Sequence, residues 1–240
     1  YVLEVNPRAS RTAPFVAKAT GVPVAKIATK VMTGMKLTEL GIVDEPVPRH
    51  VSIKESVFPF RKFAGVDIVL GPEMRSTGEV MGISDKFSLA FAKSQIAAGS
   101  VLPDSGKIFI SLTARHKDAA GAIGKDLQAL GFELLATAGT AARLEDGGVG
   151  VTRVKKIAEG HPNLIDYLKN ADVQLILNTP SGKGARTDEG RIRAAAVQQG
   201  VPCITTLAAA EAAVQAMLAM KDGPMEVESL QARYASLSSV

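Results

Sequence analysis

The chain has 240 residues, a formal net charge of +4 and 46% hydrophobic residues, which is enough apolar material for one or two domains with real cores. No apolar run approaches the roughly 20 residues of a membrane span, no signal peptide is recognisable, and scattered basic residues with 5% aromatic residues argue against a nucleic-acid-binding face. Because Cys203 is the single cysteine and the three histidines lie far apart, we expect a cytoplasmic protein without a disulfide framework or a zinc site.

The first hundred residues are predicted to form an irregular region. Apolar residues with helical spacing on both sides of the break Gly21-Val22-Pro23 predict two short helices, the second of which should stop at Gly34. In chain order we expect a strand over 1–5, two short helices within 15–32, a strand over 51–60, loop with a short strand over 62–84 and a helix over 87–99.

After a seam near residues 99–106, strand and helix patterns alternate about five times. This alternation predicts an α/β fold with a doubly wound parallel sheet. The stretch 138–148 is predicted to be a small-residue turn, and the tail 224–240 an extension packed on the surface. Strands are expected over 107–112, 132–137, 151–154, 173–178 and 202–206, and helices over 117–131, 163–171, 190–200 and 207–220.

Polar residues gather where these predicted strands end, and the carboxyl ends of parallel strands meet at one edge of a sheet. Threonine hydroxyls, glycine N–H groups, lysines and a helix N-terminus together make an anion pocket. The same residues also fit ordinary helix caps and turns, but their coincidence in several loops favours the anion site. They are Ser111 and Lys117, the stretch 137–140, Lys155 and Lys156, and the stretch 178–184.

These loops carry no carboxylate or histidine in a position suited to a general base. His116 precedes Lys117 as a solvated residue or cap, and Asp172 and Asp188 are expected to lie outside the turns that form the pocket. We therefore interpret the second region as a sensor that binds a ligand and performs no chemistry.

The opening strand points to a different site. Glu4 and Asn6 offer carboxylate and amide oxygens, which are hard ligands suited to Mg²⁺ or Mn²⁺. Arg8 and Arg11 follow closely, and guanidinium groups hold phosphate oxygens in a bidentate fork. The stretch therefore resembles the last strand of a nucleotide-and-metal site whose remaining strands are not in this chain.

Several motifs resemble the large subunit of carbamoyl-phosphate synthase, over residues 1 to about 221. The resemblance implies that residues 1–104 are the C-terminal part of the carbamoyl-phosphate-forming ATP-grasp domain, and that residues 105–240 are a methylglyoxal-synthase-like allosteric domain. The motifs are LEVNPRASRT, PFVAKATG, SIKESVFPFRKFAGVDIVLGPEMRSTGEVMG, ISLTARHK, ATAGT, VKKIAEG and NTPSGKGARTDEGRIRAAA.

The resemblance also implies roles for individual residues. Glu4 and Asn6 would hold the divalent metal ions on ATP, and Arg8 and Arg11 would bind phosphate. Glu55 and Thr205 match an ornithine site at the seam, but Cys203 stands where ornithine-responsive members have tyrosine, which argues against ornithine activation. The residues that match the allosteric site for nucleotides such as UMP or IMP are Lys117, Thr137, Thr140, Lys156, Asn178 and Thr179.

The function implied is that of a ligase, which makes carbamoyl phosphate from bicarbonate, glutamine-derived ammonia and ATP for arginine or pyrimidine synthesis. The implied partners are a glutaminase small subunit and the upstream part of the large subunit, in an oligomer. We expect this fragment to be inactive alone, because it lacks the nucleotide cradle. Two alternatives stay open: a free-standing module that senses nucleoside monophosphates, and a lyase of the methylglyoxal synthase type.

Overall fold

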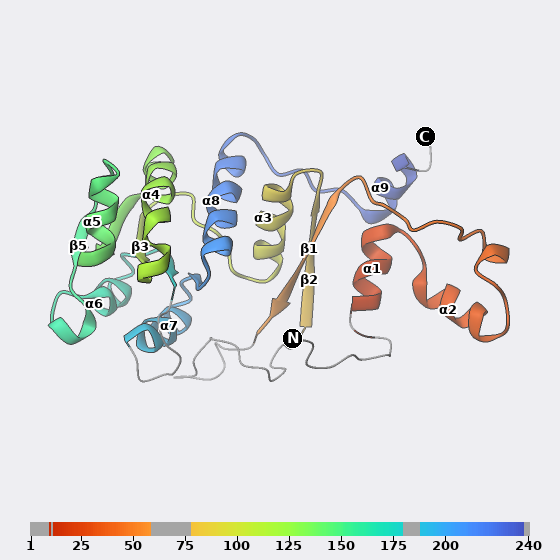
Figure 1. Ribbon diagram of the computed structural model, residues 1–240, viewed down its shortest axis with the longest axis horizontal. Helices are drawn as coiled ribbons and strands as arrows, with labels where there is room; N and C mark the ends of the chain where they lie inside the picture. Colours follow the sequence, from red (N-terminus) through yellow and green to blue (C-terminus); the bar gives the residue numbers. More distant parts are fainter. Residues whose placement is uncertain (1–9, 11, 59–77, 180–187, 238–240) are drawn as a thin grey trace.

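The structure is a computed structural model that describes residues 10, 12–58, 78–179 and 188–237. Its elements lie roughly in a row (Figure 1), from a pair of helices at one end, through a strand pair, to a larger α/β unit at the other end. Among the described residues, no helix has both the length and the apolar character that crossing a bilayer requires.

Two short helices open the described chain, as predicted. Helices α1 (Thr12–Thr20) and α2 (Val24–Met32) are separated at Gly21, whose φ of +75° suits glycine. Gly34, with φ of +102°, follows the end of α2 and confirms the predicted stop. A short 3₁₀ helix, η1 (Thr38–Leu40), precedes the first strand.

A strand pair covered by one helix forms the middle of the molecule. Strand β1 (Val51–Val57) pairs antiparallel with β2 (Gly78–Ser84), and α3 (Phe87–Ala97) packs on both. At Gly82 the contact is so close that a Cβ atom would lie 1.9 Å from the Ala90 carbonyl oxygen. Glycine is therefore the residue that allows α3 to sit this near the sheet.

The larger unit is a five-stranded parallel sheet with strand order β5-β4-β3-β6-β7. The order reverses between β3 and β6, which confirms the predicted doubly wound sheet and places the topological switch point between these two strands. The strands are β3 (Lys107–Ser111), β4 (Glu133–Thr137), β5 (Thr152–Val154), β6 (Leu175–Asn178) and β7 (Cys203–Ile204).

The helices of this unit cover both faces of the sheet. Helices α4, α5 and α8 contribute to the hydrophobic cluster on one face, and α6 and α7 to the cluster on the other. The helical segments are η3 (Ala114–Ala119), α4 (Ala120–Ala129), α5 (Ala138–Asp146), η4 (Ile157–Glu159), α6 (Leu164–Lys169), α7 (Asp188–Gln199) and α8 (Leu207–Lys221).

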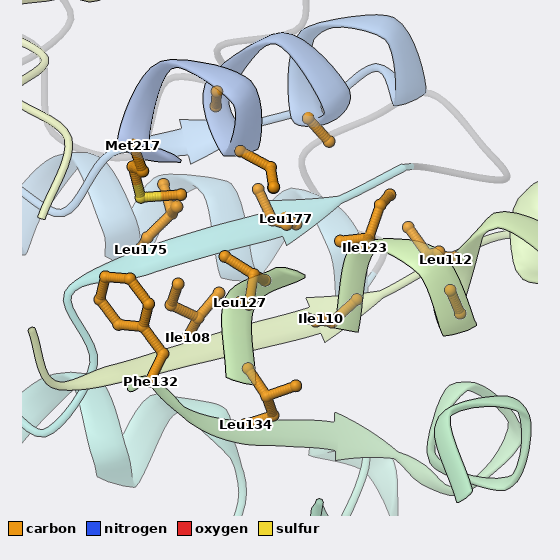
Figure 2. Close-up of a cluster of buried hydrophobic side chains, with 14 of the residues drawn as sticks. Ile108, Ile110, Leu112, Ile123, Leu127, Phe132, Leu134, Leu175, Leu177 and Met217 are labelled. Carbon is orange, nitrogen blue, oxygen red and sulfur yellow. The ribbon is translucent and has the colours of Figure 1, made fainter. Parts of the chain in front are cut away.

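Strand residues alternate between the two hydrophobic clusters. Ile108 and Ile110 of β3 face the α4/α5/α8 side, whereas Phe109 faces the α6/α7 side. Figure 2 shows the first cluster, where Leu175 and Leu177 of β6 lie with Ile108 and Ile110 beneath the helices. Successive side chains of a strand point to opposite faces of the sheet, so a nearly continuous apolar strand contributes side chains to both hydrophobic clusters.

One predicted element is wrong. The stretch 138–148 was expected to be a turn, but most of it forms helix α5, which ends before Gly147. Ala141 and Leu144 are buried on one side of this helix, and alanine, arginine, leucine and glutamate are good helix formers. The glycine and threonine near its start suggested a turn, but they belong to the helix's first turn.

The first region and the sheet share a core across the expected seam. Phe91 and Ala92 of α3 belong to the same hydrophobic cluster as Ala213 and Met217 of α8. The tail then forms α9 (Leu230–Leu237), which lies beside α1 (Figure 1). The tail is therefore packed on the surface as predicted, and it returns to the beginning of the described chain.

Candidate functional site

The ends of β3, β4 and β6 meet at one edge of the parallel sheet. Ser111 of β3 is in register with Asn178 of β6, and Ile110 with Ala136 of β4. A cavity of about 190 Å³ lies at this edge. Its lining comes from the strand ends and the segments that follow them: Ser111, Leu112, Thr113, Lys117, Thr137, Gly139, Thr140, Lys156, Thr179 and Glu189.

Lys117 is aimed at the beginning of α5. A Cβ atom built at Gly139 would lie 2.6 Å from Lys117 Nζ, so glycine leaves the space that the ammonium group occupies. Backbone N–H groups at the first turn of a helix lack intrahelical partners and carry partial positive charge. The ammonium and the N-terminus of α5 therefore give this cavity a positive end, which favours an anion.

Two threonines of the cavity brace its walls. Thr140 Oγ1 accepts a hydrogen bond of 3.1 Å from the Leu112 N–H, and Thr179 Oγ1 accepts one of 2.9 Å from the Thr113 N–H. Both hydroxyls thereby tie the loop after β3 to neighbouring elements. Thr137 differs, because its side chain makes no capping hydrogen bond to α5 among the described residues. Of the three, Thr137 is the best placed to offer its hydroxyl to a ligand.

Asn178 is the strongest local sign of a ligand. Its side chain is 1% exposed, and neither its amide nitrogen nor its amide oxygen has a hydrogen-bond partner among the described residues. Buried amides are almost always paired, because an unpaired polar group costs free energy. Asn178 lies at the end of β6, directly before Thr179 of the cavity wall.

A second cavity of about 290 Å³ adjoins the first, because Ser111, Thr137, Lys156 and Glu189 line both. Its own lining combines Lys155 and Asp188 with the apolar residues Phe109, Ile157, Leu164 and Ile192. The combined site thus has a positive, hydroxyl-rich end and a wider end with apolar walls and carboxylates.

The expectation that Asp188 lies outside the site is wrong, and Glu189 was missed altogether. Both residues belong to the first turn of α7, and this turn lines the cavities. The available signal was their position in the sequence: acidic residues at the start of a helix, in the segment that follows the carboxyl end of a central strand.

A third cavity, of about 340 Å³, lies at the seam between the two regions. Glu55 of β1 and Thr205 after β7 both line it, as the resemblance implied, and Cys203 lies with them. Glu55 Oε2 accepts a 3.0 Å hydrogen bond from Gln95 Nε2. Burial raises the pKa of Glu55 above its ordinary value of 4.5, against the lowering effect of that hydrogen bond.

The predicted metal and phosphate residues of the opening strand, Glu4, Asn6, Arg8 and Arg11, lie outside the described residues. Within the described ranges, no group of three or more histidine, cysteine, aspartate or glutamate side chains could hold a metal ion.

The larger α/β unit is a recognised class of domain. Residues 120–205 match the family described as MGS-like domain, which agrees with the five-stranded parallel sheet. Residues 1–40 match the family described as the ATP binding domain of the carbamoyl-phosphate synthase L chain.

Relatives identify the family of the whole chain. The carbamoyl phosphate synthase large chain of Rhodopirellula baltica is 80% identical over 235 residues, which are 98% of this chain and 22% of that relative. The large chain of a Synechocystis species is 50% identical over 96% of this chain and 22% of its own length. That of Methanosarcina barkeri is 53% identical over 93% of this chain and 56% of its own length.

The chain belongs to the carbamoyl phosphate synthase large chain family and corresponds to its C-terminal portion. It spans about a fifth of the length of the first two relatives, at 22% of each. The resemblance stated from the motifs is therefore confirmed.

Proposed function

We propose that this chain is the effector-binding end of an ATP-dependent carbamoyl phosphate synthase, and that the sheet edge binds a nucleoside monophosphate such as UMP or IMP. The observation that carries the proposal is Asn178, a buried amide without a described partner beside a cavity with a positive end. The six expected residues support it, because five of them line that cavity and Asn178 adjoins it: Lys117, Thr137, Thr140, Lys156 and Thr179.

The phosphate would occupy the smaller cavity. Lys117 and the N–H groups at the start of α5 would neutralise its charge, and the Thr137 hydroxyl would donate a hydrogen bond. A hydrogen bond to a charged group is worth about 1.5–3 kcal/mol, so each of these contacts should matter for affinity.

The nucleoside would occupy the larger cavity. Apolar walls from Ile157, Leu164 and Ile192 suit the face of a base, and the Asp188 carboxylate suits ribose hydroxyls, which donate hydrogen bonds. A carboxylate this close to the phosphate end would repel a second anion. The site is thus better matched to a monophosphate with a neutral sugar and base than to a more highly charged polyphosphate.

The lyase alternative has one observation in its favour, because Glu189 lines both cavities and could act as a general base. Phosphate elimination from a triose phosphate would release inorganic phosphate. We favour the sensor, since the apolar end of the site has no use in the chemistry of so small a substrate. A phosphate-release assay separates the two, and release that Glu189→Gln abolishes would support the lyase.

The proposal also covers the reaction of the complete enzyme, which needs parts of the large chain beyond the residues of this chain. The complete enzyme would join bicarbonate, ammonia released from glutamine by a small subunit, and phosphate from ATP, in the cytoplasm, for arginine or pyrimidine synthesis. Glu4 and Asn6 would hold Mg²⁺ or Mn²⁺, which neutralises phosphate charge, and Arg8 and Arg11 would bind phosphate. These roles, and assembly into an oligomer, rest on the family resemblance.

The seam cavity is the proposed place for a second effector. Glu55 could pair with the ammonium group of an amino acid such as ornithine, and Thr205 could offer its hydroxyl. Cys203 supplies no phenol where ornithine-responsive members have one, so we expect weak or absent ornithine binding.

Calorimetric titration of the whole chain tests the nucleotide proposal. UMP or IMP should bind and uridine should not, because the phosphate supplies the charged contacts. Lys117→Met should weaken UMP binding by about tenfold or more, because each 1.4 kcal/mol is a factor of ten. Lys125→Met is the matched control, since Lys125 is an exposed lysine of α4 that lines neither cavity. Equal binding of uridine, or of UMP by the Lys117 variant, would refute the proposal.

A further inference from the structure

The tail after α8 crosses from the sheet unit to the first helix of the described chain. In Figure 1 the tail leaves the end of α8, passes α3, and ends as α9 beside α1, far along the row from the sheet. We call residues 225–234 of this tail the clasp. It touches both regions, and each contact can be traced to named atoms.

The clasp begins on the sheet unit. Met225 packs against the main hydrophobic cluster, which contains α4 and α8. Just before it, Lys221 Nζ donates long hydrogen bonds of 3.5 and 3.4 Å to the carbonyl oxygens of Ala129 and Leu130, where α4 ends. The start of the tail is therefore fixed to the same core that supports the parallel sheet.

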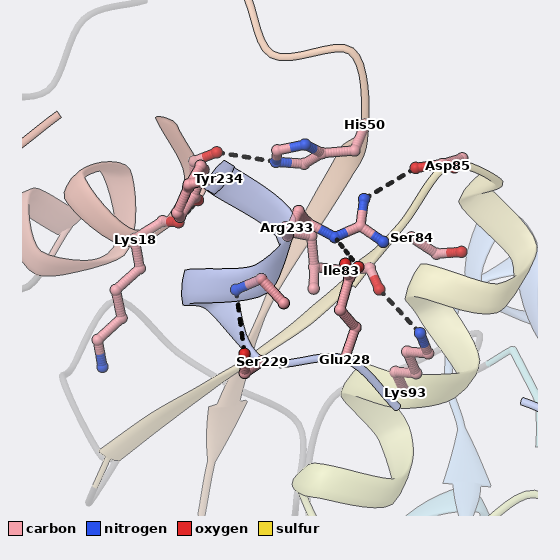
Figure 3. Close-up of polar contacts among 12 residues, drawn as sticks. Lys18, His50, Ile83, Ser84, Asp85, Lys93, Glu228, Ser229, Arg233 and Tyr234 are labelled. Carbon is pink, nitrogen blue, oxygen red and sulfur yellow. Dashed lines mark hydrogen bonds and ion pairs between the residues drawn. The ribbon is translucent and has the colours of Figure 1, made fainter. Parts of the chain in front are cut away.

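Arg233 joins the clasp to the middle of the molecule. Its Nη1 donates a 2.8 Å hydrogen bond to Asp85 Oδ1, in the turn between β2 and α3, and its Nε lies 3.2 Å from Glu228 Oε2. Figure 3 shows the guanidinium between these two carboxylates. The Arg233 side chain is 16% exposed, so this partly buried charge is paired on two sides.

Tyr234 joins the clasp to α1. Its hydroxyl donates to the carbonyl oxygen of Lys18, one of the last carbonyls of the helix, which have no intrahelical partner. Its ring covers Gly21, where a Cβ atom would lie 2.9 Å from the ring. His50 Nε2 lies 2.8 Å from the Ala19 carbonyl oxygen on the same helix end, and Figure 3 shows His50 close to Tyr234.

Among the described residues, helix α1 has few other contacts, one of which is a 3.1 Å hydrogen bond from Lys54 Nζ of β1 to Thr12 Oγ1 at its start. Ala19 is its one buried residue within the part of the chain that the structure describes. Its neighbour α2 has no buried residue among those described, so α2 cannot anchor it in a core. A helix of nine residues is marginal without tertiary packing. The contacts of Tyr234 and His50 at its C-terminal end thus account for much of its attachment.

We propose that the clasp is a latch that holds α1 in place and links its position to that of α8. With the latch closed, α1 is protected, and when Arg233 and Tyr234 release, α1 opens locally while the sheet stays folded. Helix α1 lies within residues 1–40, which match the ATP binding domain family. Helix α8 follows directly after residues 120–205, which match the MGS-like domain family. The latch is therefore a physical connection between these two parts, and it does not depend on any ligand.

Hydrogen exchange measured by mass spectrometry on the full chain tests the latch, since exchange reports local opening. Tyr234→Ala should raise exchange in residues 12–20 by about tenfold or more, because it removes a half-buried aromatic ring that covers Gly21 and the hydroxyl that contacts Lys18. Exchange in β3 should not change. Gln231→Ala, an exposed substitution on the same helix, is the matched control and should leave α1 unchanged.

Asp85→Asn gives a second test that does not disturb the core, because the Asp85 side chain is 80% exposed. Asp85→Asn should raise hydrogen exchange in α1 by up to about fivefold, which is the effect expected from losing one surface ion pair. Arg233→Ala should raise exchange less in the Asp85→Asn variant than in the parent protein, because the two residues interact. Unchanged α1 exchange in both Tyr234→Ala and Asp85→Asn would overturn the proposal. A rise of equal size in β3 and α1 would overturn it as well, because the opening would then be global.

Discussion

Thr140 should contribute to stability as well as to the candidate site. Its hydroxyl accepts the Leu112 N–H at 3.1 Å, and the two residues are 1% and 5% exposed. Thr140→Val keeps the shape of the side chain and removes the acceptor. The Leu112 N–H would then be buried with no acceptor, because no other hydrogen bond of this group occurs among the described residues.

The expected cost follows from that single group. A buried donor left unsatisfied costs about 1–3 kcal/mol of unfolding free energy. In a chain of this length, each kcal/mol lowers Tm by about 2–4 °C. Thr137→Val is the matched control, because Thr137 lines the same cavity but makes no capping hydrogen bond among the described residues. Thr137→Val should change the unfolding free energy by no more than about 0.5 kcal/mol, as is usual for substitutions that break no buried hydrogen bond.

Urea unfolding followed by circular dichroism, together with UMP titration, separates the two roles. Thr140→Val should lose stability, whereas Thr137→Val should stay as stable as the parent and lose affinity for UMP. If Thr140→Val unfolds at the parent's urea midpoint, the hydrogen bond to Leu112 does not stabilise the fold. If Thr137→Val loses as much stability as Thr140→Val, the reasoning from hydroxyl contacts is wrong.

Two further predictions concern carboxylates in the first region. Burial raises the pKa of the Glu55 carboxyl above 4.5, so the folded state binds the carboxyl proton more tightly than the unfolded state does. The stability that results is present below about pH 4.5 and is lost as pH rises through the folded pKa. Glu55→Gln should therefore flatten the dependence of unfolding free energy on pH above 4.5, and an unchanged slope would contradict this. In the complete large chain, Glu4→Gln should lower carbamoyl phosphate formation by about 10²–10³-fold without unfolding the protein, and near-normal turnover would make Glu4 a plain strand residue.

Much of the sheet could be predicted because its signals are local. Strand β3 reads as a continuous apolar run, and Ile108, Phe109 and Ile110 indeed divide between two cores. Polar residues at the strand ends then had to meet at one edge, since parallel strands place their carboxyl ends together. That rule correctly grouped Lys117, Thr137 and Thr179 in one cavity.

The remainder depended on contacts that no local pattern contains. The first turn of α5 contains glycine and threonine, which are also common in turns. The segment is a helix because residues such as Leu144 are buried in the core on one side of it. Asp188 reaches the cavity because α7 begins at this residue and packs on the sheet beside the end of β6. Arg233 and Asp85 are 148 positions apart, so their pairing depends on the complete fold.

Helix α7 gives a physical reason why the two candidate effector cavities should not be independent. Its first turn, with Asp188 and Glu189, lines the larger cavity at the sheet edge, and Val197 near its other end lines the seam cavity. The helix has 12 residues, so it spans about 18 Å, and Ile192 and Ala196 are packed in the core between its ends. Packed helices shift as units rather than bend, because close-packed interiors resist local compression. A ligand that moves the first turn should thus alter the seam cavity, where Glu55 and Thr205 meet.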